Sequence, residues 1–598
     1  MELATIDLIV LFTYFGFTLF IGLWVARRAG KSASEFFLSG RSMPWWLLGM
    51  SMVATTFSTD TPNLVTDITR TSGVSGNWIW WAFLLTGMLT TFVYAALWRR
   101  SEVLTDIEFY EIRYSGRPAA FLRGFRALYL GVFFNVMVMA SVTLAAIKIG
   151  AVMFHWSALQ TVGVALVVTV VFSAAGGLRG VLLTDSILFV VAMAGSIAAA
   201  IVAVRHPAVG GLGALMENPQ VTGRLSLLPD FRDPTNLVPM FLIPIAVQWW
   251  AAWYPGAEPG GGGYIAQRML AAKTEGHATG ATLFFNVAHY ALRPWPWILV
   301  ALASLVVFPD LESLGRAFPH VDPQMVKHDL AYPAMLTFLP SGLLGLVVGS
   351  LAAAYMSTIS THLNWGSSYI VNDFYRRFVR PEAEEKELVR IGRISTVLLM
   401  VVAAVVALQL ENALQAFQIL LQIGAGTGLL FILRWFWWRI NAWSELAAMT
   451  ISFAVAIFFF VQHKTAQGGL GGLEPWQELL IGVVITTVGW VLVTLLTRPT
   501  ATPQLRSFYE LTRPGGPGWQ RVIREAEAEG QSLGTDGVWK VPFGIMCMLL
   551  GSLAVYSSLF AVGYWLYDSR GLAVGLTVIA ALSIVVLIRT WTRANRAE

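Results

Sequence analysis

Long apolar stretches, separated by short polar segments, run along almost the whole chain. About fifteen of these stretches are long enough to cross a bilayer, which takes roughly 20 predominantly apolar residues in a helix. The pattern predicts an all-α, polytopic membrane protein with about 15 transmembrane helices. The predicted spans are residues 6–26, 44–72, 77–98, 124–154, 158–176, 182–204, 236–262, 278–308, 333–371, 391–409, 412–433, 442–462, 476–497, 543–566 and 571–588.

Two of the spans are interrupted by helix-breaking residues. The first break contains Asp60 and Pro62, and the second runs from Tyr254 to Gly263 and is rich in proline and glycine. Lipid cannot hydrogen-bond a peptide group, so unwound backbone at membrane depth is stable only where protein encloses it. Two such breaks, at corresponding positions in the two halves of a chain, indicate the binding site of a secondary transporter. For the second break, a simple loop between two helices is the alternative.

The interrupted spans are the second and the seventh, which are five spans apart. A repeat with an odd number of spans must re-enter the membrane from the opposite face, so spans 2–6 and 7–11 are predicted to be inverted repeats. This interpretation divides the chain into four regions. They are residues 1–43 with an extra span and a loop, 44–235 with the first repeat, 236–440 with the second, and 441–598 with peripheral spans and a polar loop at 498–541.

Charge and composition agree with a membrane protein. Of the 598 residues 56% are hydrophobic and only 13% are charged. About 30 of the 40 Lys and Arg residues lie in loops on one predicted side, and the positive-inside rule makes that side cytoplasmic. We therefore expect a multi-pass protein of the cell membrane with its N-terminus outside and its C-terminus in the cytoplasm. The net charge of +5 follows from this topology and does not indicate a nucleic-acid partner.

The residue types needed for catalysis or metal clusters are scarce. Cys547 is the only cysteine, so neither an internal disulfide nor a cysteine metal cluster can form. The eight histidines show no ligand spacing, and the sequence contains no Ser/His/Asp set or carboxylate dyad. The chain is therefore not expected to be an enzyme.

One face of span 9 is unusually polar. Ala354, Ser357, Thr358, Thr361 and His362 share this face by their helical spacing. Hydroxyl and carbonyl oxygens suit a hard, weakly charged cation such as Na⁺. The alternative is a packing face whose hydroxyls bond back to their own helix.

Span 2 offers oxygen atoms that complement this face. Unwinding after residues 54–58 frees backbone carbonyls near the middle of the membrane. Asp60, in the break, either binds a cation or an amine or caps the second half-helix. Asp185, at the start of span 6, is either an interfacial cap or part of an ion exit route.

Further polar groups lie inside other spans. They can line a solute cavity or pair with one another, and the sequence does not distinguish these roles. They are Gln418 and Gln422 in span 11, Glu258 in the second break, and Asn286, His289, Tyr290 and Arg293 in span 8.

Several motifs, taken in order, resemble those of the sodium/solute symporter family, which includes sodium-coupled sugar, proline, sialic acid and monocarboxylate carriers. The resemblance covers about residues 6–440. The motifs are Glu35 to Arg41 before span 2, Gly176-Gly177-Leu178 before Thr184-Asp185, Tyr264 to Arg268 followed by Leu270 to Lys273, and Ser357-Thr358 followed by Asn372 to Tyr375.

The resemblance implies the inverted-repeat fold named after a bacterial leucine transporter, and it assigns two sets of residues. The sodium site would use backbone carbonyls of Ala54, Phe57 and Ala354 and hydroxyls of Ser357 and Thr358, with Asp185 as the ion-linked carboxylate. Substrate contacts would come from Thr56, Asp60, Thr61, Trp250, Glu258, Tyr264, Gln418 and Gln422.

Together these features predict a sodium-coupled symporter that imports a small polar solute by alternating access. Sugar or polyol and amino acid rank equally as substrates, with monocarboxylate behind them. The alternatives are a proton-coupled carrier of the same fold and a solute sensor without net flux. The expected partners are the solute, the coupling Na⁺ and the lipid bilayer; the oligomeric state does not follow from the sequence.

Overall fold

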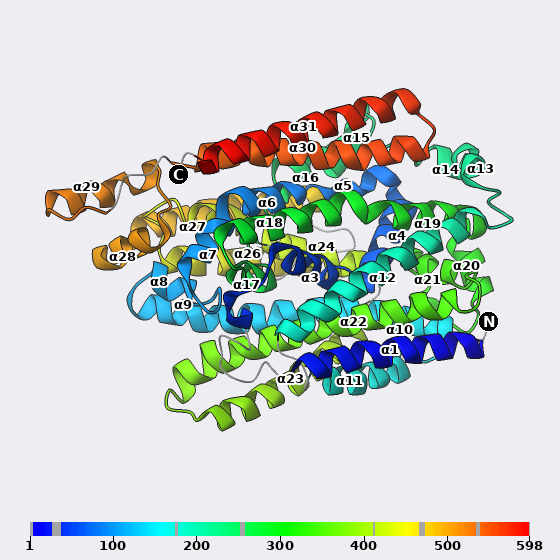
Figure 1. Ribbon diagram of the computed structural model, residues 1–598, viewed down its shortest axis with the longest axis horizontal. Coiled ribbons are helices and arrows are strands. Elements are labelled where there is room, and N and C mark those ends of the chain that lie inside the picture. The colour runs from blue at the N-terminus through cyan, green and yellow to red at the C-terminus, as the bar shows by residue number, and fades with distance from the viewer. Residues whose placement is uncertain are drawn as a thin grey trace.

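The computed structural model describes residues 4–26, 38–173, 178–251, 258–410, 413–465, 473–533 and 539–596. These residues form helices and no strand, which confirms the all-α prediction. Figure 1 shows the long helices running roughly side by side, with the two termini at opposite ends of the bundle. Residues 35–37, 176–177 and 252–257, which belong to the predicted motifs and the second break, lie outside the described residues.

Ten helices among the described residues are long and apolar enough to cross a membrane. Their positions confirm a multi-pass helical protein, and the total of about fifteen crossings stays a prediction. These helices are Val74–Ser101, Gly116–Phe154, Val181–Val204, Glu275–Val307, Leu343–Val379, Glu385–Ala407, Ala442–Gln462, Pro475–Leu496, Val541–Leu566 and Arg570–Arg593.

The other five predicted spans coincide with shorter or divided helices. Two of them are the single helices α1 (Thr5–Ala26) and α11 (Ala158–Ser173). The remaining three are divided. They are α3 (Trp45–Thr55) with α4 (Asp60–Ser72), α15 (Pro234–Leu237) and α16 (Ile243–Ala246) with α17 (Gly263–Leu270), and α24 (Ala413–Ala425) with α25 (Gly428–Leu433).

A break is present in this span, but it lies a few residues earlier than predicted, so that Asp60 and Pro62 fall in the first turn of the following helix. Helix α3 ends at Thr55, residues 56–59 are not helical, and α4 begins at Asp60. Pro62 lies in the first turn of α4, where its missing N–H would have had no partner within the helix. The break is enclosed by protein, because residues 52–59 are all buried.

The described part of the second break is also non-helical. A single turn at Gln248–Trp250 follows α16, and the described residues 258–262 before α17 are not helical. Gly260 and Gly261 have φ angles of +87° and +81°, a backbone conformation that favours glycine. A Cβ on Gly261 would lie 2.6 Å from Met269, so the glycine also permits close packing.

Helix α3 lies at the centre of the molecule. It packs against α12 (Leu178–Val204), α18 (Glu275–Val287) and α22 (Leu343–Ser368). Helix α4 packs against α19 (Pro294–Val307), α10 (Asn135–Phe154) and α24. Both ends of the first break are therefore held by helices from distant parts of the sequence.

The polar loop at 498–541 is more than a solvated linker. Its helices α28 (Thr502–Thr512) and α29 (Gln520–Ala528) carry a buried face, and Trp519 between them is fully buried. The Trp519 indole donates to the carbonyl oxygen of Trp435 at 2.9 Å and its ring stacks on Phe508. Helices α30 (Val541–Leu566) and α31 (Arg570–Arg596) form a hairpin at one edge of the bundle (Figure 1).

Candidate functional site

The polar face of α22 meets the end of α3. The Thr358 hydroxyl donates to the carbonyl oxygen of Thr55 at 3.2 Å, so the two helices come within hydrogen-bonding distance at this point. Ala354, Ser357 and Thr358 are all buried, as are Ala54 and Phe57 on the other side. The structure thus brings together the residues that the sequence predicts for sodium.

Asp185 of α12 is fully buried beside this meeting point. It accepts hydrogen bonds from the hydroxyls of Ser357 and Ser51, the latter at 2.6 Å. Because the Ser357 hydrogen points to the carboxylate, the lone pairs of the same oxygen remain free to accept a cation. Arg268 of α17 donates to Ser51 at 3.3 Å, which links Asp185 to the segment after the second break.

The last carbonyl groups of α3 have no partners within the helix and need others. Side chains supply most of these partners, so the end of α3 is tied to several neighbouring elements. The carbonyl oxygen of Val53 accepts from Thr56 Oγ1 at 2.9 Å and from Arg293 Nη1 at 3.0 Å. The carbonyl oxygen of Ala54 accepts from the Phe57 backbone N–H at 3.0 Å. The carbonyl oxygens of Thr55 and Thr56 accept from the hydroxyls of Thr358 and Thr61, the latter at 3.1 Å.

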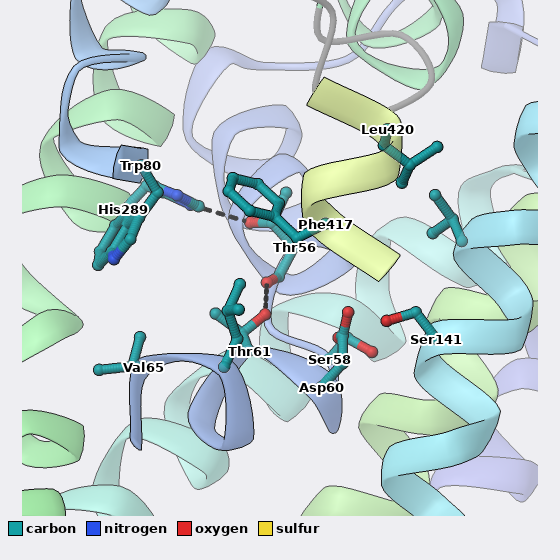
Figure 2. A pocket seen from close by; sticks show the side chains of 12 residues that line it. Thr56, Ser58, Asp60, Thr61, Val65, Trp80, Ser141, His289, Phe417 and Leu420 are labelled. Atoms are coloured by element: carbon teal, nitrogen blue, oxygen red, sulfur yellow. Dashed lines mark hydrogen bonds between the residues drawn. The ribbon is translucent and has the colours of Figure 1, made fainter. Parts of the chain in front are cut away.

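A cavity of about 60 Å³ adjoins the first break. Figure 2 shows its side chains converging from α3, α4, α10, α24 and the region of Trp80 and His289. Its walls combine hydroxyl groups, one carboxylate and apolar surface. The lining residues are Thr56, Ser58, Asp60, Thr61, Leu64, Val65, Trp80, Val138, Ser141, His289, Phe417 and Leu420.

The polar groups of the cavity form two sets. Thr56 Oγ1 lies 3.2 Å from His289 Nδ1, and Thr61 Oγ1 donates to the Thr56 carbonyl oxygen. Asp60 and Ser141 lie on the other side of the cavity in Figure 2. The cavity can therefore exchange several hydrogen bonds with a polar solute.

Two aromatic groups complete the wall next to Thr56. His289 lies in a π-helical turn, Ala288–Leu292, a feature that often marks functional sites. The Trp80 ring lies edge-on to His289 at 5.7 Å and stacks on Tyr290, with ring centroids 5.9 Å apart. The Trp80 indole N–H donates to Asn77 at 2.8 Å, so the ring orientation is fixed.

Three predicted substrate residues, Thr56, Asp60 and Thr61, line this cavity, and the other five do not. Glu258 and Tyr264 line a second cavity of about 40 Å³. Gln418 is exposed and Gln422 donates to Glu478 at 3.2 Å, whereas Trp250 is half-buried and packs against Gly428. On α24 the cavity is lined instead by Phe417 and Leu420.

Glu258 belongs to a buried ion-pair cluster. It accepts two bonds from Arg126 at 2.9 Å and one from Arg434 at 3.4 Å, and all three side chains are at most 3% exposed. Arg434 also lies 3.6 Å from Glu445. Two arginines and two glutamates balance their charges here, so Glu258 is a member of an ion-pair cluster whose partners, Arg126 and Arg434, the sequence did not predict.

Sequence reasoning did not select Trp80 or Ser141 for the cavity. Trp80 is one of 24 tryptophans, and such residues are expected at membrane interfaces. Ser141 is a single hydroxyl in an apolar span. The only sequence signal for Ser141 would have been a small polar residue among apolar ones in a span of the predicted repeats.

Comparison with known proteins identifies the family. The profile of the sodium:solute symporter family matches residues 36–452, which is well over half of the chain. The chain belongs to the sodium:solute symporter family. Sodium is accordingly its coupling ion, and the protein is a transporter of small polar solutes, not an enzyme.

Several relatives are sodium-coupled sugar or polyol carriers. The chain is 26% identical to a sodium/glucose cotransporter of Vibrio parahaemolyticus, over 76% of this chain and 85% of that protein. It is 27% identical to a sodium/mannose cotransporter of Bos taurus, over 75% and 78%. It is 25% identical to sodium/myo-inositol cotransporter 2 of Homo sapiens, over 85% and 78%.

A solved structure shares the fold. The outward-open, substrate-bound state of a Na⁺-coupled sialic acid symporter matches with a TM-score of 0.64 at 19% identity, over 83% of this chain and 99% of that one. This match supports the leucine-transporter-like architecture predicted from the broken spans.

Proposed function

We propose that this symporter imports a neutral, polyhydroxylated solute, a sugar or a polyol. The observation that carries the proposal is the cavity beside the first break, where hydroxyls of Thr56, Thr61 and Ser141 accompany the Asp60 carboxylate. Solute hydroxyls both donate and accept hydrogen bonds, so they match such a set of partners. Trp80 adds an aromatic surface against which an apolar sugar face can pack.

The named substrates of the relatives, glucose, mannose and myo-inositol, belong to the same chemical class. An amino acid is the second candidate, because the Asp60 carboxylate would attract an ammonium group. A monocarboxylate ranks last, since the same carboxylate would repel it.

Sodium is proposed to bind between α3 and α22. Support comes from the Thr358–Thr55 hydrogen bond, which a bound cation would replace, and from Asp185, which orients the Ser357 hydroxyl. Because residues 56–59 border both the sodium oxygens and the cavity, sodium that fixes this segment raises solute affinity. The proposed ligands are the carbonyls of Ala54, Phe57 and Ala354 and the hydroxyls of Ser357 and Thr358.

Alternating access is proposed to use the two inverted repeats, residues 44–235 and 236–440. The bundle of spans 2, 3, 7 and 8 would rock against spans 4, 5, 9 and 10, exposing the cavity to each side in turn. The charge asymmetry of the loops supports an outside N-terminus and a cytoplasmic C-terminus in the cell membrane.

A thermal-shift screen of the purified protein tests the solute class. Hexoses, myo-inositol, neutral amino acids and lactate are compared with and without sodium. We expect stabilisation by a sugar or polyol that requires sodium, followed by sodium-driven uptake of the same compound into proteoliposomes. A sodium-dependent shift with lactate or an amino acid alone would refute the proposed class, and binding without uptake would indicate a sensor.

A further inference from the structure

Arg293 is a fully buried arginine whose side chain reaches the end of α3. Its Nη1 atom donates to the carbonyl oxygen of Val53 and to the hydroxyl of Thr56, both at 3.0 Å. Its guanidinium lies against the rings of Phe57 and Trp297, at 5.5 and 5.1 Å from their centroids. Its side chain is 0% exposed, so no solvent screens the charge.

No carboxylate lies within ion-pair distance of Arg293 in the described part of the chain. Its Nε and Nη2 atoms also lack hydrogen-bond partners among these residues. Two other buried cations contrast with it, because Arg126 pairs with Glu258 at 2.9 Å and Lys148 with Asp329 at 2.6 Å. The Asp60 carboxylate acts on Arg293 electrostatically but forms no ion pair with it. A buried charge without an ion-pair partner is costly, and it persists where neighbouring dipoles and function retain it.

Two features compensate the charge in part. The carbonyl end of α3 carries the negative pole of the helix dipole, and the Phe57 and Trp297 ring faces attract a cation. The same helix end supplies the Ala54 and Phe57 carbonyls proposed for sodium. Arg293 and a bound sodium ion would therefore share one negative helix end.

We propose that Arg293 is a built-in cation that sets the sodium affinity of the site between α3 and α22. Its hydrogen bonds hold the Val53 carbonyl and the Thr56 hydroxyl in place. Its positive charge repels bound sodium and so lowers the affinity of the site for sodium, which allows the ion to dissociate on the side of the membrane where its concentration is low. Two unit charges on the order of 8 Å apart at an effective dielectric constant of about 20 interact strongly enough to change affinity at least tenfold. This inference rests on the proposed sodium site.

Neutral variants test the charge directly. Arg293→Gln keeps a donor for Val53 or Thr56, and Arg293→Met keeps much of the packing between the two rings. The sodium concentration for half-maximal thermal stabilisation, measured without solute, should fall about tenfold in both. Solute affinity should weaken in Arg293→Met, because Thr56 loses the hydrogen bond from Arg293. An unchanged or higher sodium requirement in a folded neutral variant would overturn the proposal, since general damage to a site cannot tighten it.

Arg293→Lys is the matched control because it retains the charge. At pH 7 its sodium requirement should stay within about threefold of the wild-type value.

The lysine variant also tests the proposal if neither neutral variant folds, because it keeps the charge, and a sodium requirement that changed tenfold or more in this variant would refute a role carried by the charge. The Ser357→Ala/Thr358→Ala double variant separates the two ideas. If that variant keeps its sodium response, the proposed sodium site itself is wrong, whatever Arg293 does.

Discussion

The Glu258→Gln substitution should destabilise the protein strongly, because it removes one negative charge from a buried cluster of four. Glu258 bonds Arg126 and Arg434, and all three side chains are at most 3% exposed. Removing one partner of a buried ion pair leaves the other charge uncompensated, which costs about 3–5 kcal/mol. Glutamine has the same shape as glutamate, so this cost is electrostatic and not a packing effect.

Thermal unfolding of the purified protein in detergent measures this loss. Glu525→Gln is the matched control, because its pair with Arg521 is 2.8 Å long but 43–64% exposed. Exposed helical pairs contribute about 0.3–0.5 kcal/mol, so the control should unfold within a degree or so of wild type. We expect Glu258→Gln to unfold several degrees lower, and Arg126→Met combined with Glu258→Gln to recover part of the loss.

A Glu258→Gln protein as stable as wild type would refute this explanation of the cluster. Solute binding by the folded Glu258→Gln protein also tests the predicted substrate role of Glu258. Unchanged solute affinity agrees with a structural role, whereas a large change in affinity at normal stability would return Glu258 to the binding site.

Three further predictions concern other regions. Trp80→Ala should weaken solute binding about tenfold in thermal-shift titrations while leaving sodium stabilisation intact; loss of the sodium response would contradict the assignment of Trp80 to the solute wall. Trp519→Ala should expose residues 498–533 to limited proteolysis, whereas Trp539→Ala, at 40% exposure, should not. The hydrogen bonds from Ser313 lower the pKa of Asp310, so this helix cap should be intact above the ordinary aspartate pKa and open only as the pH falls through the lowered pKa, measured by amide exchange of Ser313.

The predicted elements that the structure confirms are those with a strong local cause. A run of apolar residues predicts a spanning helix, and Pro62 beside Asp60 predicts, to within a few residues, where such a helix breaks. The Ser357–Thr358 pair could be matched with the α3 end because unwinding there frees backbone carbonyls and because the family resemblance assigns both segments to one sodium site.

Some residues predicted to contact the solute do not line the cavity. Their positions depend on which face of a helix points inward and on contacts between residues far apart in the sequence. Gln418 and Gln422 are four residues apart, but the face of α24 toward the cavity carries Phe417 and Leu420 instead. Glu258 pairs with Arg126, which is 132 residues away, and no local pattern predicts that contact. The π-helical turn that contains His289 likewise follows from packing and not from periodicity.

The measurement that tests the central claim most directly is a sodium titration of the Ser357→Ala/Thr358→Ala double variant. Ser350→Ala is the control, because Ser350 is a buried hydroxyl on the same helix that bonds back to Val347. If sodium binds between α3 and α22, the double variant should remain folded but lose sodium-dependent stabilisation and uptake, while Ser350→Ala keeps both. A double variant that responds to sodium as wild type does would contradict the account.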